Sequence, residues 1–418
     1  MKKQNLKSDF FKRNRQRFST LIGSDALAVV FSNPAALRTA DQYYIYRQNS
    51  DLLYLTGINQ SETILVYDSL HGHEVLFITK PDPKRELWDG KLLRIDEAQD
   101  ISGIDDVRYS DDFQTFIDNA VVHVEHLRSS GSPVDDFAKG VVNYLLKTKP
   151  SLQYANLNTE MAQLRVVKSP EELQLIKQSV AITSKAFLAL LKLVKPGNFE
   201  YQVEAEIIRT FIAHGADGHA FDPIVASGEN ACTLHYIRNN CQMKPGQLLL
   251  LDFGCECNGY AADMSRTLPV AGKFSVRQRA VYQAVLDAQK LAIEHIKPGI
   301  TIKDINKLTG SFLEQRMIDL GLFTSDNITE QDADNPLYKK YFPHGTSHFM
   351  GIDVHDVGMT DKPLEPGMVI TCEPGIYIPQ EQIGVRIEND ILITDQGCED
   401  LMQHVPREII EIERLMGG

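Results

Sequence analysis

The sequence predicts two domains: an α/β domain at the amino terminus and a larger α+β domain in which helices back a curved antiparallel sheet. Three observations lead to this prediction. Short apolar runs occur early in the chain, a strong helix start lies at Ser169, and a helix-loop-helix pattern occurs twice in the second half. Elements with one apolar face must bury it against each other, so such patterns give layered domains.

Composition places the chain among ordinary globular proteins. Its 418 residues are 43% hydrophobic and 24% charged, which is enough for two domains with full cores. The formal net charge of −13 argues against a nucleic-acid partner. Six cysteines without a secreted disulfide pattern favour the cytoplasm, and no apolar segment predicts a membrane anchor.

The amino-terminal domain is expected over residues 1–166. Apolar runs at residues 27–31, 63–67 and 74–79 predict strands, which polar and helical segments separate. The first eighteen residues hold seven Lys or Arg interleaved with phenylalanines. This pattern predicts a surface helix rather than a signal peptide.

A helix start marks the second domain, expected over residues 167–418. Ser169 is a typical N-cap, Pro170 suits the first helical position, and Glu172 completes a capping box. The helix should run to about Val194. Further helices are expected at residues 200–214 and 275–296.

The second domain carries an internal repeat. Lys-Pro-Gly separates two helical stretches at residues 195–197 and again at 297–299, and Pro-Gly opens an apolar strand at 245–246 and again at 366–367. An acid follows each Pro-Gly glycine by six residues, Asp252 in the first copy and Glu373 in the second. The common order predicts two half-domains related by a pseudo-twofold axis, with a site at their junction.

A hairpin organises the first copy. Asn258-Gly259 between two apolar runs predicts a two-residue turn, and pairing across that turn places Asp252 opposite Ser265. Asp263 then shares one face with Asp252 at about 7 to 8 Å. Burying these acids in an apolar hairpin is costly, and a metal pair about 3.5 to 4 Å apart would offset the cost.

The candidate metal ligands are Asp252, Asp263, His348, Glu373 and Glu388. So many converging acids would repel one another unless two divalent cations lay among them. Oxygen ligands with one imidazole suit Mn²⁺, Mg²⁺, Fe²⁺ or Co²⁺ better than a sulfur-rich zinc site does, and Mn²⁺ is the expected metal. Three histidines within residues 344–355, flanked by glycines, predict a functional loop.

At these motifs the chain resembles a known family, the pita-bread metallopeptidases, and within it the bacterial aminopeptidase P and prolidase group. The strings that carry the resemblance are SGENACTLHY (227–236), LDFGCECNGYAADMSRT (251–267), HGTSHFMGIDVHDVG (344–358), CEPGIY (372–377) and GVRIENDILIT (384–394). ADQYYIYRQNSDLLYLTG (40–57) is similar to the amino-terminal domain of aminopeptidase P. The resemblance implies an α/β amino-terminal domain and a pita-bread catalytic domain with a pseudo-twofold curved sheet.

The resemblance also implies how the ligands divide. Asp252 and Asp263 would hold one metal, while Asp263, His348 and Glu373 would reach the other, and Glu388 would bridge. A hydroxide between the two metals would be the nucleophile. Glu373 would also shuttle a proton.

Further catalytic residues are implied outside the ligand set. His235, His344 and His355 resemble outer histidines that bind the scissile carbonyl, the substrate backbone and the leaving nitrogen. Arg386 lies two residues before Glu388, so strand alternation puts it on the same face, where it could orient an acid. A purely structural ion pair is an equal alternative for Arg386.

The implied activity is hydrolysis of the Xaa-Pro bond, which releases the N-terminal residue from peptides with proline in second position. One alternative is a prolidase restricted to Xaa-Pro dipeptides. Another is an inactive pita-bread binding module, which the retained ligands argue against. The expected partner is a peptide substrate.

A homodimer or homotetramer is also expected. In aminopeptidase P relatives, a tryptophan matching Trp88 reaches into a neighbour's active site, although an isolated tryptophan more often anchors a local core. Asp41 is expected either near an active-site mouth or in a plain surface position.

Overall fold

The structure is a computed structural model that describes residues 6–131, 135–332 and 335–417. The chain divides after Arg165 into two compact units, here called the amino-terminal unit and the carboxyl-terminal unit. Each is described by itself. Within the described ranges, no helix is long and apolar enough to cross a bilayer.

The amino-terminal unit is built on a mixed sheet in the order β6-β5-β4-β1-β7-β8. Its strands are β1 (Ala26–Phe31), β4 (Ile64–Asp68), β5 (His73–Ile78), β6 (Asp106–Tyr109), β7 (His126–Ser130) and β8 (Gln153–Asn156), and β2 (Leu37–Thr39) pairs with β3 (Gln42–Tyr43) outside the sheet. Its helices are α1 (Ser8–Ile22), α2 (Ser50–Thr56), α3 (Pro83–Asp89), α4 (Ile95–Ser102), α5 (Phe113–Val121), α6 (Asp136–Thr148) and α7 (Asn158–Arg165). The strands predicted from the three apolar runs are confirmed as β1, β4 and β5.

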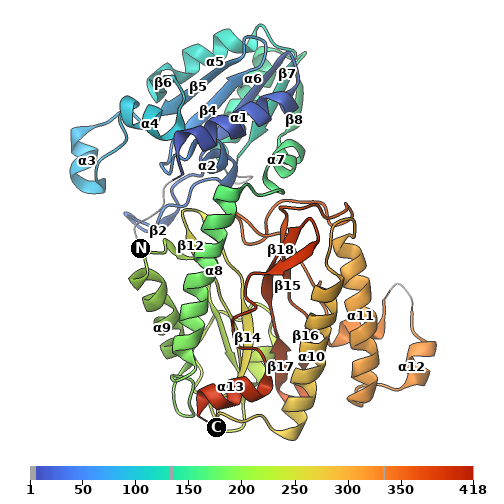
Figure 1. Ribbon diagram of the computed structural model, residues 1–418. Coiled ribbons are helices and arrows are strands. Elements are labelled where there is room, and N and C mark those ends of the chain that lie inside the picture. The colour runs from blue at the N-terminus through green and yellow to red at the C-terminus, as the bar shows by residue number, and fades with distance from the viewer. Residues whose placement is uncertain (1–5, 132–134, 333–334, 418) are drawn as a thin grey trace. The chain divides into compact units, whose positions relative to one another are not determined.

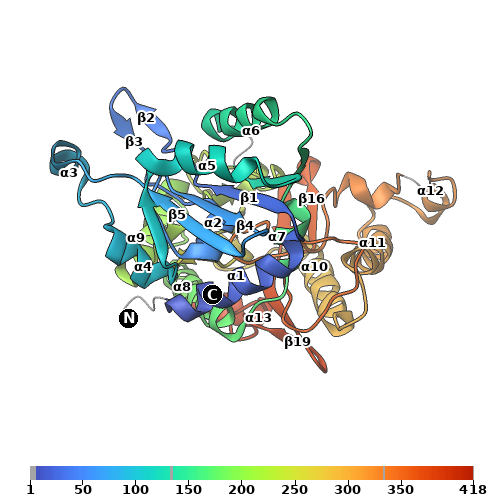
Figure 2. The same ribbon diagram turned by 90° about the horizontal axis from the view of Figure 1, so that it is seen from above.

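Helices cover both faces of this sheet (Figure 2). Apolar side chains of α5 and α6, such as Ile117 and Leu145, pack on the face formed by Val29 and Phe77. On the other side lies α1, which buries its phenylalanines and leaves most of its cations exposed. The predicted surface helix is therefore amphipathic, with one exception: Arg15 is buried and bonded to Glu74.

Two further positions in this unit bear on the sequence predictions. Trp88 lies on α3 with 85% of its surface exposed, so the alternative that it anchors a local core is wrong. Asp41 lies exposed in the turn between β2 and β3.

The carboxyl-terminal unit places strands between two helix pairs, α8 with α9 and α10 with α11 (Figure 1). Its helices are α8 (Pro170–Leu190), α9 (Glu200–Ala213), α10 (Val276–His295), α11 (Ile302–Asp319), α12 (Ser325–Thr329) and α13 (Ile409–Met416). Its strands are β9 (Gly218–His219), β10 (Ile224–Ser227), β11 (Leu248–Asp252), β12 (Cys255–Cys257), β13 (Tyr260–Ala261), β14 (Ser265–Pro269), β15 (Val369–Cys372), β16 (Gly375–Ile378), β17 (Ile383–Arg386), β18 (Asn389–Thr394) and β19 (Gly397–Asp400). They form ladders in the orders β10-β11-β14, β13-β12-β9, β15-β18-β19 and β16-β17.

The predicted capping box of α8 is present, because Ser169 accepts a hydrogen bond from the Glu172 amide and Glu172 accepts one from the Ser169 amide. The helix ends at Leu190 rather than near Val194. The chain continues there as a turn in which the Val194 amide still donates to Leu190.

The two halves of this unit repeat one pattern of backbone hydrogen bonds. Gly197 and Gly299 end the two Lys-Pro-Gly loops, and both have φ of 91°. The Gly197 amide donates to Met243 O and the Gly299 amide donates to Leu364 O, each at 2.9 Å. Each acceptor precedes the glycine of its Pro-Gly by three residues. These matched contacts support the duplication predicted from the sequence.

The hairpin register is also as predicted. Asn258 and Gly259 have φ of 50° and 81°, the left-handed values that a two-residue hairpin turn of this kind requires. Asp252 lies opposite Ser265. Between these points the strands approach so closely that a Cβ on Gly254 would overlap the backbone oxygen of Ala262.

We therefore predict that Gly254→Ala destabilises the protein by about 1 to 3 kcal/mol, because the added methyl group must push the two strands apart. Denaturant unfolding measures the effect. Gly140→Ala is the control, since a Cβ there meets no atom within 4 Å, and helix propensity predicts a gain of about 0.5 to 1 kcal/mol. A Gly254→Ala protein as stable as wild type would contradict the close approach.

Candidate metal centre

Both halves of the carboxyl-terminal unit bring acids to one buried place. Asp252 ends β11 and Asp263 precedes β14, whereas Glu373 follows β15 and Glu388 lies between β17 and β18. Asp252, Asp263 and Glu388 are 9%, 5% and 2% exposed. Glu373 is partly buried. Asp252 follows four buried leucines, whereas Ser265, Arg386 and other polar residues surround the remaining acids.

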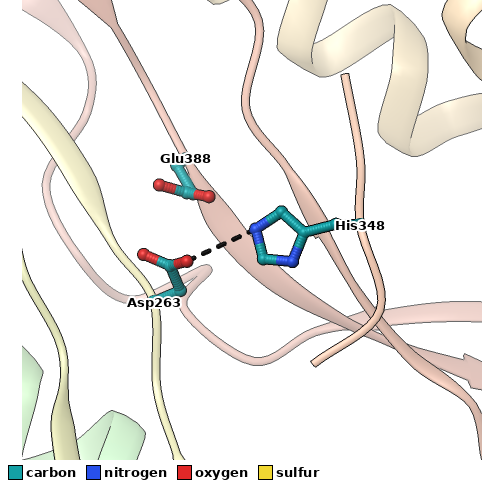
Figure 3. Close-up of side chains that lie close together, drawn as sticks. All are labelled: Asp263, His348 and Glu388. Carbon is teal, nitrogen blue, oxygen red and sulfur yellow. Dashed lines mark ion pairs between the residues drawn. The ribbon is translucent and has the colours of Figure 1, made fainter. Parts of the chain in front are cut away.

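His348 completes the cluster (Figure 3). Its Nε2 lies 3.4 Å from Asp263 Oδ2 and 3.5 Å from Glu373 Oε1. Asp263, His348 and Glu388 each offer a ligand atom, and these atoms all lie within 4.8 Å of one another. Three of the predicted ligands therefore form a group that one cation could bind, and Glu373 lies beside it.

The orientation of His348 is fixed by its backbone neighbours. Its Nδ1 lies 3.0 Å from Phe349 O, a carbonyl that can only accept, so Nδ1 carries the proton. Nε2 is then the atom with a lone pair, and it faces the acids. A hydrogen bond of this kind on the remote nitrogen is the usual support of a metal-binding histidine.

Arg386 connects the acids of the two halves. Its Nη2 donates to Asp252 Oδ2 at 2.6 Å, its Nε donates to Ser265 Oγ at 2.8 Å, and its Nη1 contacts Tyr377 OH at 2.8 Å. Ser265 Oγ in turn donates to Glu388 Oε2 at 2.7 Å. The guanidinium thus fixes one oxygen of Asp252.

Burial sets the protonation of this cluster. It raises the pKa of Asp263 well above the ordinary value, and the charges of Glu388 and Asp252 raise it further. Burial likewise raises the pKa of Glu388 and Glu373. Positive charge added among these acids would favour their ionised forms.

The predicted outer histidines gather around the same place. His344 Nε2 lies 2.7 Å from Tyr377 OH, and its Nδ1 lies 2.8 Å from Gly345 O. Burial, with the charge of Arg386, lowers the pKa of His344 to about 4. His344 is therefore uncharged at neutral pH.

His355 and His235 complete this group. The His355 ring lies edge-on to the His348 ring at 4.3 Å between centroids. Burial lowers the pKa of His355, and the charges of His348 and His235 lower it further. His235 is exposed on the loop after β10 and also contributes to the low pKa of His344.

Comparison with known proteins decides the family. The model for metallopeptidase family M24 matches residues 174–395, and that for the aminopeptidase P N-terminal domain matches residues 11–127. The chain is 37% identical to the Xaa-Pro aminopeptidase of Escherichia coli (strain K12) over 97% of each chain. It is 34% identical to Xaa-Pro aminopeptidase 3 of Homo sapiens, over 94% of this chain and 81% of the relative. Zn-substituted E. coli aminopeptidase P in complex with product superposes with a TM-score of 0.92, at 35% identity over 99% of both chains.

This chain belongs to metallopeptidase family M24. The resemblance to aminopeptidase P that the motifs predicted is confirmed over the full length, and so is the fold of an α/β amino-terminal domain followed by a pita-bread domain.

As an M24 metallopeptidase, the chain works with divalent metal ions, and its donor set fits them. Within the described part of the chain, Asp252 Oδ1 and Asp263 Oδ1 are buried without a hydrogen-bond partner. A buried carboxylate oxygen without a donor is costly, and a hard cation satisfies it directly. The raised pKa values of the neighbouring acids point to the same missing positive charge.

Three residues of the M24 site were not predicted from the sequence. Tyr377 joins His344 to Arg386, and Ser265 joins Arg386 to Glu388. Asp390 accepts a hydrogen bond from the Asp263 amide at 3.2 Å. Signals existed for two of them, because the hairpin register placed Ser265 opposite Asp252 and strand alternation would have placed Asp390 on the face of Glu388.

The raised pKa of Asp263 predicts how the metal-free M24 protein responds to pH. A carboxyl whose pKa is higher in the folded chain contributes stability below its unfolded pKa of about 4 and loses that stability as pH rises through the folded value. In a chelator, Asp263→Asn should therefore gain free energy of unfolding over wild type as pH rises above about 4, by about 1.4 kcal/mol per unit of pKa shift.

Denaturant unfolding at pH 5 and pH 8 tests this, with the exposed Asp395→Asn as control. If the stability of Asp263→Asn relative to wild type did not increase from pH 5 to pH 8 without metal, the account would be contradicted.

Proposed function

We propose that the site cleaves the Xaa-Pro bond with two divalent cations held by Asp252, Asp263, His348, Glu373 and Glu388. The chain is an Xaa-Pro aminopeptidase, a metallo-exopeptidase of family M24. The observation that carries the site assignment is the cluster of acids in which Asp252 Oδ1 and Asp263 Oδ1 are buried without donors.

The ligands divide as the motifs suggest. Asp252 and Asp263 would hold one cation, Asp263, His348 and Glu373 the other, and Glu388 would bridge. When bound, the pair would activate a water molecule at neutral pH and polarise the scissile carbonyl. The oxygen-rich set favours Mn²⁺.

The chain's own residues prepare these ligands. Arg386 holds Asp252 Oδ2 and leaves Oδ1 directed inward. Ser265 holds Glu388 Oε2 in the same way. Because these two ligands each have one oxygen fixed by the protein, the other oxygen need not reorganise when a cation binds.

The outer histidines would bind the peptide. Uncharged His344 and His355 can donate or accept at neutral pH, so they suit the scissile carbonyl, the substrate backbone and the leaving nitrogen. His235, on the loop after β10, lies close enough to lower the pKa of both histidines. Glu373 would pass a proton to the leaving nitrogen.

Proline in second position fits this arrangement. The scissile Xaa-Pro amide is tertiary and has no N–H, so a peptidase that reads the amide hydrogen cannot recognise it. In the proposed site, the cation pair and the neutral histidines would bind the scissile carbonyl, so binding does not depend on an amide hydrogen. The leaving ring nitrogen needs a proton, which Glu373 would supply.

A substrate-length series tests the function. With added Mn²⁺, we expect cleavage of Gly-Pro-Yaa tripeptides and longer peptides, with Gly-Pro a poorer substrate, because the predicted aminopeptidase accepts residues beyond proline. Peptides with alanine in second position are the control. Cleavage of Gly-Pro alone would instead identify a prolidase, and no cleavage would identify a binding module.

A homodimer or homotetramer is proposed from the exposure of α3. Trp88 and Leu87 on this helix are 85% and 81% exposed, which is unusual for such large apolar side chains. In an oligomer, Trp88 would reach a neighbour's substrate site. The free state of all six cysteines accords with the proposed cytoplasmic location.

We predict that Trp88→Ala lowers kcat/KM for Gly-Pro-Yaa by about tenfold, because truncating a large aromatic side chain at an interface removes its contacts with the partner. The melting temperature should not change, since the exposed side chain is not part of a core. Ile410→Ala, which is 77% exposed in the carboxyl-terminal unit, is the control. Unchanged kinetics for Trp88→Ala would remove the role of α3 in the site.

A further inference from the structure

The loop that carries His235 is hydrogen-bonded at its start to a buried carboxylate. Glu200, the first residue of α9, is 0% exposed. Its Oε1 accepts hydrogen bonds from Ser227 N and Ser227 Oγ at 2.7 Å each, and from Asn230 Nδ2 at 3.1 Å. Ser227 ends β10, so these three bonds fix the point where the loop leaves the sheet.

The same carboxylate holds the loop on the far side of His235. Glu200 Oε2 accepts from Tyr236 OH and from Cys241 N, each at 2.9 Å. The Glu200 amide donates back to Cys241 O at 3.0 Å. Tyr236 directly follows His235, so the segments on both sides of the histidine are tied to one side chain.

A separate contact anchors the end of this loop. Asn239, in a left-handed conformation with φ of 47°, donates to Glu204 on the next turn of α9 and accepts from the Val225 amide. This contact ties the loop to α9 and β10 but does not reach His235. Glu200, through Tyr236, is the link to the residue beside the histidine.

We propose that Glu200 is a positioning residue for Xaa-Pro cleavage, which holds the loop at residues 227–241 so that His235 faces the substrate. The inference rests on the role proposed above for His235. A carboxylate only accepts, and it can receive all five donors at once. An amide in its place would turn an N–H group toward donors and release one side of the loop.

A double-mutant cycle tests whether Glu200 acts through His235. Glu200→Gln should lower kcat/KM for Gly-Pro-Yaa by about tenfold or more, because small displacements of a substrate-binding group are costly. His235→Ala should lower it at least as far. The double variant should match His235→Ala within about twofold, since a loop without the imidazole has nothing left to position.

The possible outcomes separate the two levels of the account. If the two losses in kcat/KM multiply in the double variant, the carboxylate acts independently of His235. That result would overturn the role of Glu200 but not the proposed function. Wild-type protein that does not cleave Xaa-Pro bonds would overturn the proposed function and the role of Glu200 together.

Hydrogen exchange gives a readout that does not depend on activity. In Glu200→Gln, the Ser227 and Cys241 amides should exchange faster than in wild type, while the β14 and β18 amides keep their protection. Unchanged exchange at both amides would overturn the inference.

Tyr236→Phe serves if Glu200→Gln does not fold, because it removes one donor and leaves the remaining four. It should lower kcat/KM by about threefold to tenfold, and this loss should also vanish in the His235→Ala background. Tyr282→Phe is the matched control. Tyr282 lies on α10, and the substitution removes a tyrosine hydroxyl that donates to Arg407 O at 2.8 Å. An equal loss in Tyr282→Phe would overturn the inference.

Discussion

The burial of several carboxylates close to one another is the constraint on which this site depends. Asp263, Glu373 and Glu388 lie in an interior that raises the pKa of each, mainly through burial. Arg386 supplies one positive charge, and it is committed to Asp252. For all of these acids to be ionised, further positive charge is needed, and divalent cations supply it. Without metal, the acids take up protons more readily than exposed carboxyls do.

The duplicated half-domains explain how such a cluster can form at all. Each half places acids next to an apolar strand that follows a Pro-Gly, and neither half gathers a complete ligand set alone. A backbone hydrogen bond of 3.0 Å from the Glu388 amide to Ser265 O joins the halves at the site itself. The ligands therefore come together only when the two halves pack against each other during folding. This couples metal affinity to the stability of the carboxyl-terminal unit.

Local sequence signals predicted much of this correctly. The Asn258-Gly259 turn determined the hairpin register, and Ser169 marked the start of α8, because turn and cap chemistry act over a few residues. Contacts between distant segments were not predictable in this way. The ion pair of Arg386 with Asp252 spans 134 residues. The Glu200 contacts likewise depend on how α9 meets a loop that has no periodic pattern.

Metal titration of the chelator-treated protein tests the central claim most directly. Manganese would be added stepwise while bound metal and Gly-Pro-Yaa cleavage are measured on the same samples. The account predicts no cleavage without metal, binding that saturates at about two ions per chain as in other two-metal sites, and cleavage that rises with occupancy. Full cleavage by protein shown to be free of metal would contradict it.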